Sequence, residues 1–228
     1  MDKEFNQLYY ESKAWEQSRW LGYRCLKPPT DMMVQQEIIM ETKPDVIIET
    51  GTYEGGSAVF YASIFQLMGT EIGHVITIDK KVWRTGEAGD GFISQGWLID
   101  RVTSYTGSST DPTIIRHVVE HLGAIYGIHR RSPKIMVVLD SNHNKRHVLK
   151  ELELYSSFVT PGCYLIVEDT IISPDVAPHS YPGPAEAVDT YMKKAGGAFI
   201  VDTSREKHML SFHKGGYLLR TNISLPKL

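Results

Sequence analysis

The sequence predicts a doubly wound α/β fold: a Rossmann-like, seven-stranded, mostly parallel sheet that ends in an antiparallel pair of strands. Four apolar runs of strand length are too continuous to leave one face in water. They span 45–50, 74–79, 134–140 and 163–169. Helical patterns alternate with these runs, at 57–69, 111–127 and 144–158. Covered strands that alternate with helices are typical of a parallel sheet with helices on both faces.

Three weaker segments complete the predicted sheet. Residues 101–109 read as a strand between the second and third strong ones. Segments 196–205 and 208–220 alternate apolar and polar residues on either side of a polar turn, which predicts an antiparallel pair. We therefore expect seven strands within one domain of residues 44–228.

Two irregular segments lie outside this pattern. Residues 1–43 precede the first strand, are rich in Tyr and Trp, and contain a helical run at 31–41. This segment is either a packing helix or a lid over the active site, and its aromatic residues would also suit a homo-oligomer interface. Residues 83–97 carry four glycines without a clear period, which favours a binding or lid loop.

Composition limits the classes of partner. The 228 residues are 42% hydrophobic and carry a net charge of −3, so the chain has no basic field for nucleic acid. No apolar stretch approaches the roughly 18 residues of a membrane span. Only Cys25 and Cys163 are present, and the N-terminus lacks the apolar core of a signal peptide. We expect a cytoplasmic protein that acts on small molecules.

A glycine-rich turn follows the first strong strand. In the sequence ETGTYEGGS at 49–57, Gly51, Gly55 and Gly56 fall in the turn, and Ser57 begins the next helix. Glycines there allow a ligand to approach the backbone at the carboxyl end of the sheet. The spacing is neither GxGxxG nor a P-loop, which argues against nicotinamide cofactors and ATP. A tight turn without a ligand is the alternative.

Acidic residues near this turn indicate the kind of cofactor. Asp79 ends the second strong strand, where an acid can accept hydrogen bonds from both ribose hydroxyls, although it could also cap a loop. Glu49 and Glu54 add negative charge that would repel a pyrophosphate but attract a cationic sulfonium. S-adenosylmethionine (SAM) meets both requirements.

Three further acids end the third and fourth strong strands. If these strands are neighbours, Asp140, Glu168 and Asp169 converge at one edge of the sheet and could share an ion. Oxygen ligands favour Mg²⁺ or a similar hard ion over Zn²⁺. The alternative is a set of acids that bind loop N–H groups or basic side chains.

His143 follows Asp140 by three residues and is the histidine beside these acids. It could be a helix cap, a metal ligand or a base. A metal-bound hydroxyl has a lowered pKa, and a neutral imidazole within hydrogen-bond reach could take its proton.

Four segments resemble, in order and spacing, the cephalosporin hydroxylase and rhamnosyl O-methyltransferase family. They are ETGTYEGGSAVFYASIFQLMG, VITIDK, VVLDSNH and LIVEDT, and the similarity runs from about residue 30 to 195. The resemblance implies a class I methyltransferase fold that holds SAM at the glycine turn and at Asp79. It also implies Mg²⁺ on Asp140, Glu168 and Asp169, with His143 at the position of the general base. No redox centre is recognisable, which argues against hydroxylation.

These observations predict a SAM-dependent, Mg²⁺-dependent O-methyltransferase acting on a sugar or similar vicinal diol, with His143 and Asp140 as its catalytic residues. A catechol or phenylpropanoid O-methyltransferase and a non-catalytic SAM-binding partner of an oxygenase are the alternatives. The aromatic residues expected to frame the acceptor are Tyr9, Tyr10, Trp20 and Tyr181. The predicted cofactor-binding residues are Glu49, Gly51, Tyr53, Glu54, Gly55, Ser57, Asp79, Ser108 and Asp140.

Overall fold

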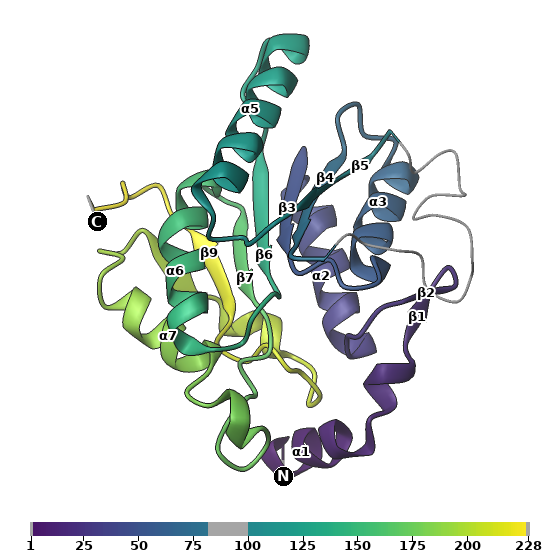
Figure 1. Ribbon diagram of the computed structural model, residues 1–228, viewed down its shortest axis with the longest axis vertical. Helices are drawn as coiled ribbons and strands as arrows, with labels where there is room; N and C mark the ends of the chain where they lie inside the picture. Colours follow the sequence, from purple (N-terminus) through teal and green to yellow (C-terminus); the bar gives the residue numbers. More distant parts are fainter. Residues whose placement is uncertain (1, 82–99, 227–228) are drawn as a thin grey trace.

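A computed structural model describes residues 2–81 and 100–226 of the chain. Its centre is a sheet of seven strands in the order β5-β4-β3-β6-β7-β9-β8 (Figure 1). The strands are β3 (Val46–Thr50), β4 (His74–Asp79), β5 (Val102–Thr106), β6 (Ile135–Leu139), β7 (Tyr164–Val167), β8 (Phe199–Val201) and β9 (Tyr217–Arg220). Strands β3 to β7 pair in parallel, whereas β9 is antiparallel to both β7 and β8. The predicted fold class is confirmed.

The central strands form where the apolar runs predict them. Every residue of β3, β6 and β7 is buried, as expected for strands covered on both faces. The last strand is shorter than the predicted 208–220 and begins at Tyr217. The preceding backbone bonds to side chains instead of a strand: Ser211 N donates to Asn6 Oδ1, and Phe212 N to Asp31 Oδ2.

The three predicted helices of the domain are present as α3 (Gly56–Met68), α5 (Pro112–His129) and α6 (Lys145–Tyr155), the last followed by the 3₁₀ turn η2 (Ser156–Phe158). Side chains at the N-caps explain where two of them begin: Asp111 accepts from Thr113 N and Asn144 from Arg146 N. Three further elements follow β7. They are η3 (Pro178–Ser180), α7 (Pro184–Met192) and η4 (Thr203–Glu206). The first two have no prediction, and η4 replaces the end of the predicted strand at 196–205, where Asp202 accepts from Ser204 N.

Helices cover both faces of the sheet. The connection from β3 to β4 through α3 and that from β6 to β7 through α6 run in opposite directions along the sheet. Because such crossovers are right-handed, α3 and α6 lie on opposite faces. Helix α2 packs beside α3, and α7 packs beside α6 (Figure 1). The strand order reverses between β3 and β6, where ligands bind in open α/β sheets.

The N-terminal segment consists of α1 (Asp2–Ser12), η1 (Ala14–Gln17), the hairpin β1 (Arg19–Trp20) with β2 (Tyr23–Arg24), and α2 (Pro29–Thr42). Helix α2 confirms the predicted helical run, and its Val34, Ile38 and Ile39 belong to the same core as the strands. Helix α1 lies farther out and contacts the loop before β9, where Asn6 Nδ2 donates to Met209 O. Core packing begins before α2, since Cys25 belongs to the same core and Trp20 and Tyr23 pack against it. A separate unit of residues 1–43 stays a prediction.

Two other predictions concern membrane-spanning helices and the loop at 83–97. Among the described residues, no helix has both the length and the apolar character needed to span a membrane. The proposed loop at 83–97 lies outside the described residues.

Candidate active site

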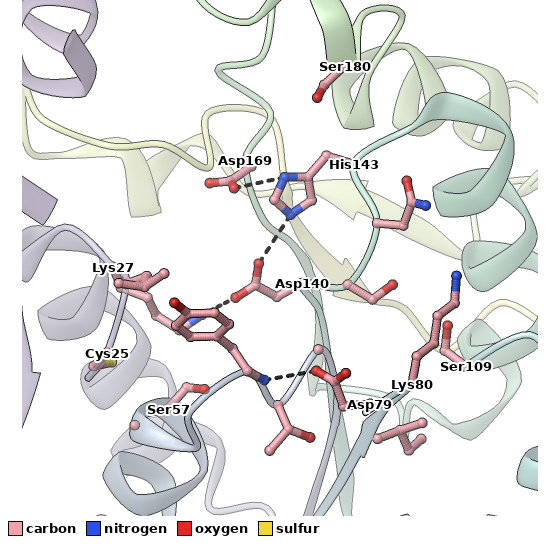
Figure 2. Close-up of a pocket in the computed structure, with 18 of the residues that line it drawn as sticks. Cys25, Lys27, Ser57, Asp79, Lys80, Ser109, Asp140, His143, Asp169 and Ser180 are labelled. Atoms are coloured by element: carbon pink, nitrogen blue, oxygen red, sulfur yellow. Dashed lines mark hydrogen bonds and ion pairs between the residues drawn. The ribbon is translucent and has the colours of Figure 1, made fainter. Parts of the chain in front are cut away.

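A cavity of about 500 Å³ opens at the carboxyl ends of the parallel strands, which is within the size range of small-molecule sites (Figure 2). Residues that follow β3, β4, β6 and β7 line it, together with Tyr10, Trp15 and Lys27 of the N-terminal segment. Five of the predicted cofactor-binding residues lie on its wall. They are Gly51, Tyr53, Ser57, Asp79 and Asp140.

The glycine turn is required by the close approach of neighbouring chain segments. Gly51 has φ +90°, and a Cβ atom there would lie 1.8 Å from the carbonyl oxygen of Asp140. Gly55 has φ +77° as the residue before α3. At Gly56 a Cβ would lie 2.0 Å from the carbonyl oxygen of Arg24. The turn is thus a packing necessity that also leaves backbone exposed to the cavity at Gly51.

Asp79 combines the two roles that its position allows. Its Oδ2 accepts from Tyr53 N at 2.9 Å, and its Oδ1 accepts from Lys81 N at 3.0 Å. The first of these bonds anchors the backbone of Tyr53, which is left-handed at φ +47°. Each carboxylate oxygen keeps further acceptor capacity, and the side chain lines the cavity. Loop capping and ribose binding are therefore compatible.

Glu49 lies beneath the cavity and is fully buried. Its Oε2 accepts from Thr77 Oγ1 at 2.6 Å, while Oε1 has no hydrogen-bond partner among the described residues. Burial raises the pKa of Glu49 to about 7, against the opposing effects of Lys27 and its hydrogen bonds. The structure therefore places this acid behind the cavity wall.

Two other predicted residues also lie off the wall. Glu54 Oε1 accepts from Arg24 Nη1 at 3.0 Å, so its charge is paired. The hydroxyl of Ser108 contacts that of Thr110 at 3.1 Å, and it is the next residue, Ser109, that lines the cavity. Sequence spacing alone does not separate Ser108 from Ser109.

The acids after β6 and β7 converge on His143, as Figure 2 shows. His143 Nδ1 lies 3.2 Å from Asp169 Oδ2, and Nε2 lies 3.4 Å from Asp140 Oδ1. One donor atom from each of the three side chains falls within 4.8 Å of the others, which is close enough to share a metal ion. His143 Nε2 is buried, and in the part of the chain that the structure describes its contact with Asp140 is an ion pair without hydrogen-bond geometry.

Glu168 points away from this group. It is 2% exposed, and its Oε1 accepts from Gln35 Nε2 at 2.9 Å. Its Oε2 bonds to the ammonium of Lys27, which also donates to Asp140 Oδ2 at 2.7 Å. Neither Lys27 nor Gln35 is among the site residues that the sequence predicts. The only signal for Lys27 is a lysine set between Leu26 and Pro28, ahead of a buried helix.

Burial and neighbouring charges set the pKa values of His143, Asp140 and Glu168. Burial lowers the pKa of His143, but Asp169 and Asp140 outweigh it and raise that pKa to about 9. Burial raises the pKa of Asp140, but Lys27 and His143 hold it below its ordinary value. Burial and the charge of Asp140 raise the pKa of Glu168 to about 7. The group therefore contains both a low-pKa acid and a protonated imidazole at neutral pH.

An aromatic pair forms the wall on the side of the N-terminal segment. The rings of Tyr10 and Trp15 stack with centroids 5.6 Å apart, and Trp15 packs edge-on against Phe212. Of the four aromatic residues predicted to frame the acceptor, Tyr10 lines the cavity. Trp20 instead packs on Phe60, Tyr9 packs on Phe212, and Tyr181 follows the lining residue Ser180.

Comparison with known proteins assigns this chain to a family. The sequence profile of the family Rhamnosyl O-methyltransferase/CmcI matches residues 12–221. A rhamnosyl O-methyltransferase of Mycobacterium leprae is 30% identical over 223 residues, covering 96% of this chain and 90% of the relative. One from Mycobacterium tuberculosis is 33% identical over 220 residues, covering 96% and 84%.

Solved structures agree on the fold. A structure of CmcI with Mg and SAM matches with a TM-score of 0.64 at 24% identity, covering 90% of this chain and 77% of that one. CalS11, a TDP-rhamnose 3'-O-methyltransferase, matches with a TM-score of 0.54 at 14% identity, covering 85% and 80%. The chain belongs to the rhamnosyl O-methyltransferase/CmcI family and is a SAM-dependent O-methyltransferase.

Proposed function

We propose that this enzyme transfers the methyl group of SAM to a hydroxyl of a rhamnosyl or similar sugar, with a divalent ion in the site. The observation that carries the proposal is the position of His143 between Asp140 and Asp169 at the cavity wall. Two mycobacterial relatives are named rhamnosyl O-methyltransferases, and CalS11 is named for TDP-rhamnose. These names support a sugar acceptor over a catechol.

The SAM side of the cavity is the part beside the glycine turn. Gly51 exposes backbone there, Ser57 stands in the first turn of α3, and Asp79 offers acceptor capacity for ribose hydroxyls. The carboxylates of Asp79 and Asp140 would also favour a cationic sulfonium. Tyr53 also lines the cavity, and the charge of Glu54 is paired with Arg24. The predicted residues that lie off the wall are Glu49, Glu54, Gly55 and Ser108.

Asp140 and Asp169 fit a hard divalent ion, since both are carboxylates within reach of one point. Glu168 is the third predicted ligand, and it would join them only if its carboxylate left Lys27. When bound, such an ion lowers the pKa of a hydroxyl that it coordinates.

His143 would hold and remove the proton of the acceptor hydroxyl. A base must be neutral, whereas Asp169 and Asp140 keep the pKa of the free imidazole at about 9. Neutralisation of these two carboxylates by a cation would remove the cause of that shift. His143 would then have a pKa closer to that of an ordinary imidazole, in the range suited to a base.

The acceptor would lie beside the aromatic pair of Tyr10 and Trp15. Their stacked rings offer an apolar face against which the C–H face of a sugar packs. His179 and Ser180 line the same cavity and supply polar groups. These residues would hold the ring so that one hydroxyl meets His143.

A methyl-transfer assay tests the proposal. Purified enzyme, labelled SAM and Mg²⁺ are incubated with a rhamnosyl glycoside or with a catechol, and products are identified by mass spectrometry. We expect a methylated rhamnoside and no product in excess EDTA. Methylation of the catechol alone would replace the sugar hypothesis, and SAM binding without turnover on either would favour a binding subunit.

A further inference from the structure

Lys27 is a buried cation that the mechanism above does not use. It is 2% exposed, which is rare for lysine unless its charge is paired. Its ammonium contacts Asp140 Oδ2 at 2.7 Å and Glu168 Oε2. The charge is therefore a fixed part of the site.

The two acids that hold Lys27 are also two of the three predicted metal ligands. Asp140 turns one oxygen toward Lys27 and the other toward His143, at 3.4 Å. Glu168 gives one oxygen to Lys27 and the other to Gln35. The Lys27 ammonium therefore contacts one oxygen of Asp140 and one of Glu168, the two acids that a divalent ion would also bind.

The surroundings hold this arrangement in place. Gln35 is itself fixed, because its Oε1 accepts from Tyr61 OH at 2.7 Å while its Nε2 donates to Glu168. Lys27 N donates to Cys25 O at 2.8 Å, and the preceding Arg24 carbonyl lies where a Cβ on Gly56 would clash. The ammonium is therefore delivered to the acids from the N-terminal segment by a tightly packed stretch of backbone.

We propose that Lys27 competes with the divalent ion for Asp140 and Glu168, and thereby sets how tightly the site binds that ion. The inference rests on the proposed function, because it takes these acids as the metal site. Two cations a few ångströms apart in a buried site repel each other strongly, since water screens them little. Release of Glu168 from Lys27 is then a part of the cost of binding the ion.

Direct binding of Mn²⁺, measured by isothermal titration calorimetry without SAM, tests the competition. Lys27→Met removes the charge and keeps most of the side-chain length, so we expect Mn²⁺ to bind about 10-fold or more tightly. Lys27→Gln should act in the same direction. Lys80→Met is the matched control, because Lys80 lines the same cavity on the side opposite Lys27 (Figure 2). It loses the same charge and should change affinity by less than about 3-fold.

The outcomes separate this inference from the proposed metal site. Each variant is first checked for a cooperative thermal transition, and Lys27→Gln, whose amide still bonds to a carboxylate, carries the test if Lys27→Met does not fold. If the wild type binds Mn²⁺ and the folded Lys27 variant binds it equally or more weakly, the competition is wrong and the metal site stands. Absence of Mn²⁺ binding in both wild type and variant overturns the metal site and the competition together.

Discussion

The turn after β3 and the strand ends after β6 and β7 shape one cavity by different means. The turn depends on backbone geometry: Gly51 is needed because the carbonyl of Asp140 occupies the space of a side chain. The strand ends depend on charge, since Asp140, His143 and Asp169 hold one another by ion pairs. Substitutions in the turn should therefore damage the fold and cofactor binding, whereas those at the strand ends should damage chemistry.

The largest effect is expected at His143. His143→Ala removes the proposed base and should lower kcat by about 10²–10⁴-fold, while the Kd for SAM changes by less than about 3-fold. His147→Ala is a matched control, because His147 lines the same cavity but pairs with Glu151 and Ser109 instead of Asp140 and Asp169, and it should lower kcat by less than about 10-fold. Equal losses of kcat in the two variants would contradict the role of His143 as the base.

Gly51→Ala should act through the fold. The added methyl meets a carbonyl oxygen at 1.8 Å at a φ of +90°, so we expect a loss of stability of about 3 kcal/mol and SAM affinity about 100-fold weaker. Urea unfolding measures the loss of stability, and isothermal titration calorimetry measures the affinity for SAM. Gly123→Ala lies in α5 with open space around it and should instead stabilise by up to about 1 kcal/mol. Wild-type stability in Gly51→Ala would show that the turn can move.

The charge cluster should make stability depend on pH in the presence of EDTA. The folded pKa of His143, about 9, lies above its ordinary value of 6.5, so the protonated form is favoured by folding. Its contribution is complete below pH 6.5 and is lost as pH rises through 9. Between pH 6 and 9.5 the wild type should lose about 2 kcal/mol more stability than His143→Gln. Glu168 titrates in both proteins, so parallel pH curves would contradict the assignment to His143.

Asp79 both anchors the backbone of the glycine turn and carries a charge at the cavity wall. Its replacement should have the smallest effect of the four changes. Asp79→Ala removes the acceptor for Tyr53 N and for ribose hydroxyls, and we expect SAM to bind about 10-fold more weakly. Asp79→Asn keeps one acceptor for Tyr53 and should recover the stability but not the full affinity. An unchanged Kd in Asp79→Ala would leave it as a loop cap only.

The sequence predicts the sheet well because burial on both faces leaves continuous apolar runs. It does not predict α7, and it wrongly predicts a strand over the loop before β9, because the apolar and polar residues there alternate while their backbone bonds to distant side chains. Ser211 N, for example, bonds to Asn6, 205 residues away.

The candidate site is likewise predictable from the sequence only in part. Strand ends identify Asp140, His143 and Asp169, but not the direction of Glu168, whose carboxylate bonds to Lys27 and Gln35 after β7 has ended. Lys27 is 113 residues from Asp140 and 141 from Glu168, so no local pattern indicates their contact.

The docking of α1 on the loop before β9 has a consequence for folding. Asn6 bonds to Met209 and to Ser211, at separations of 203 and 205 residues. Closing so long a segment of chain is costly in entropy and slow, so these contacts form after the local ones. On a ribosome, the aromatic wall must therefore wait for nearly the whole chain, and the nascent domain can pair its parallel strands β3 to β7 before it completes its substrate pocket.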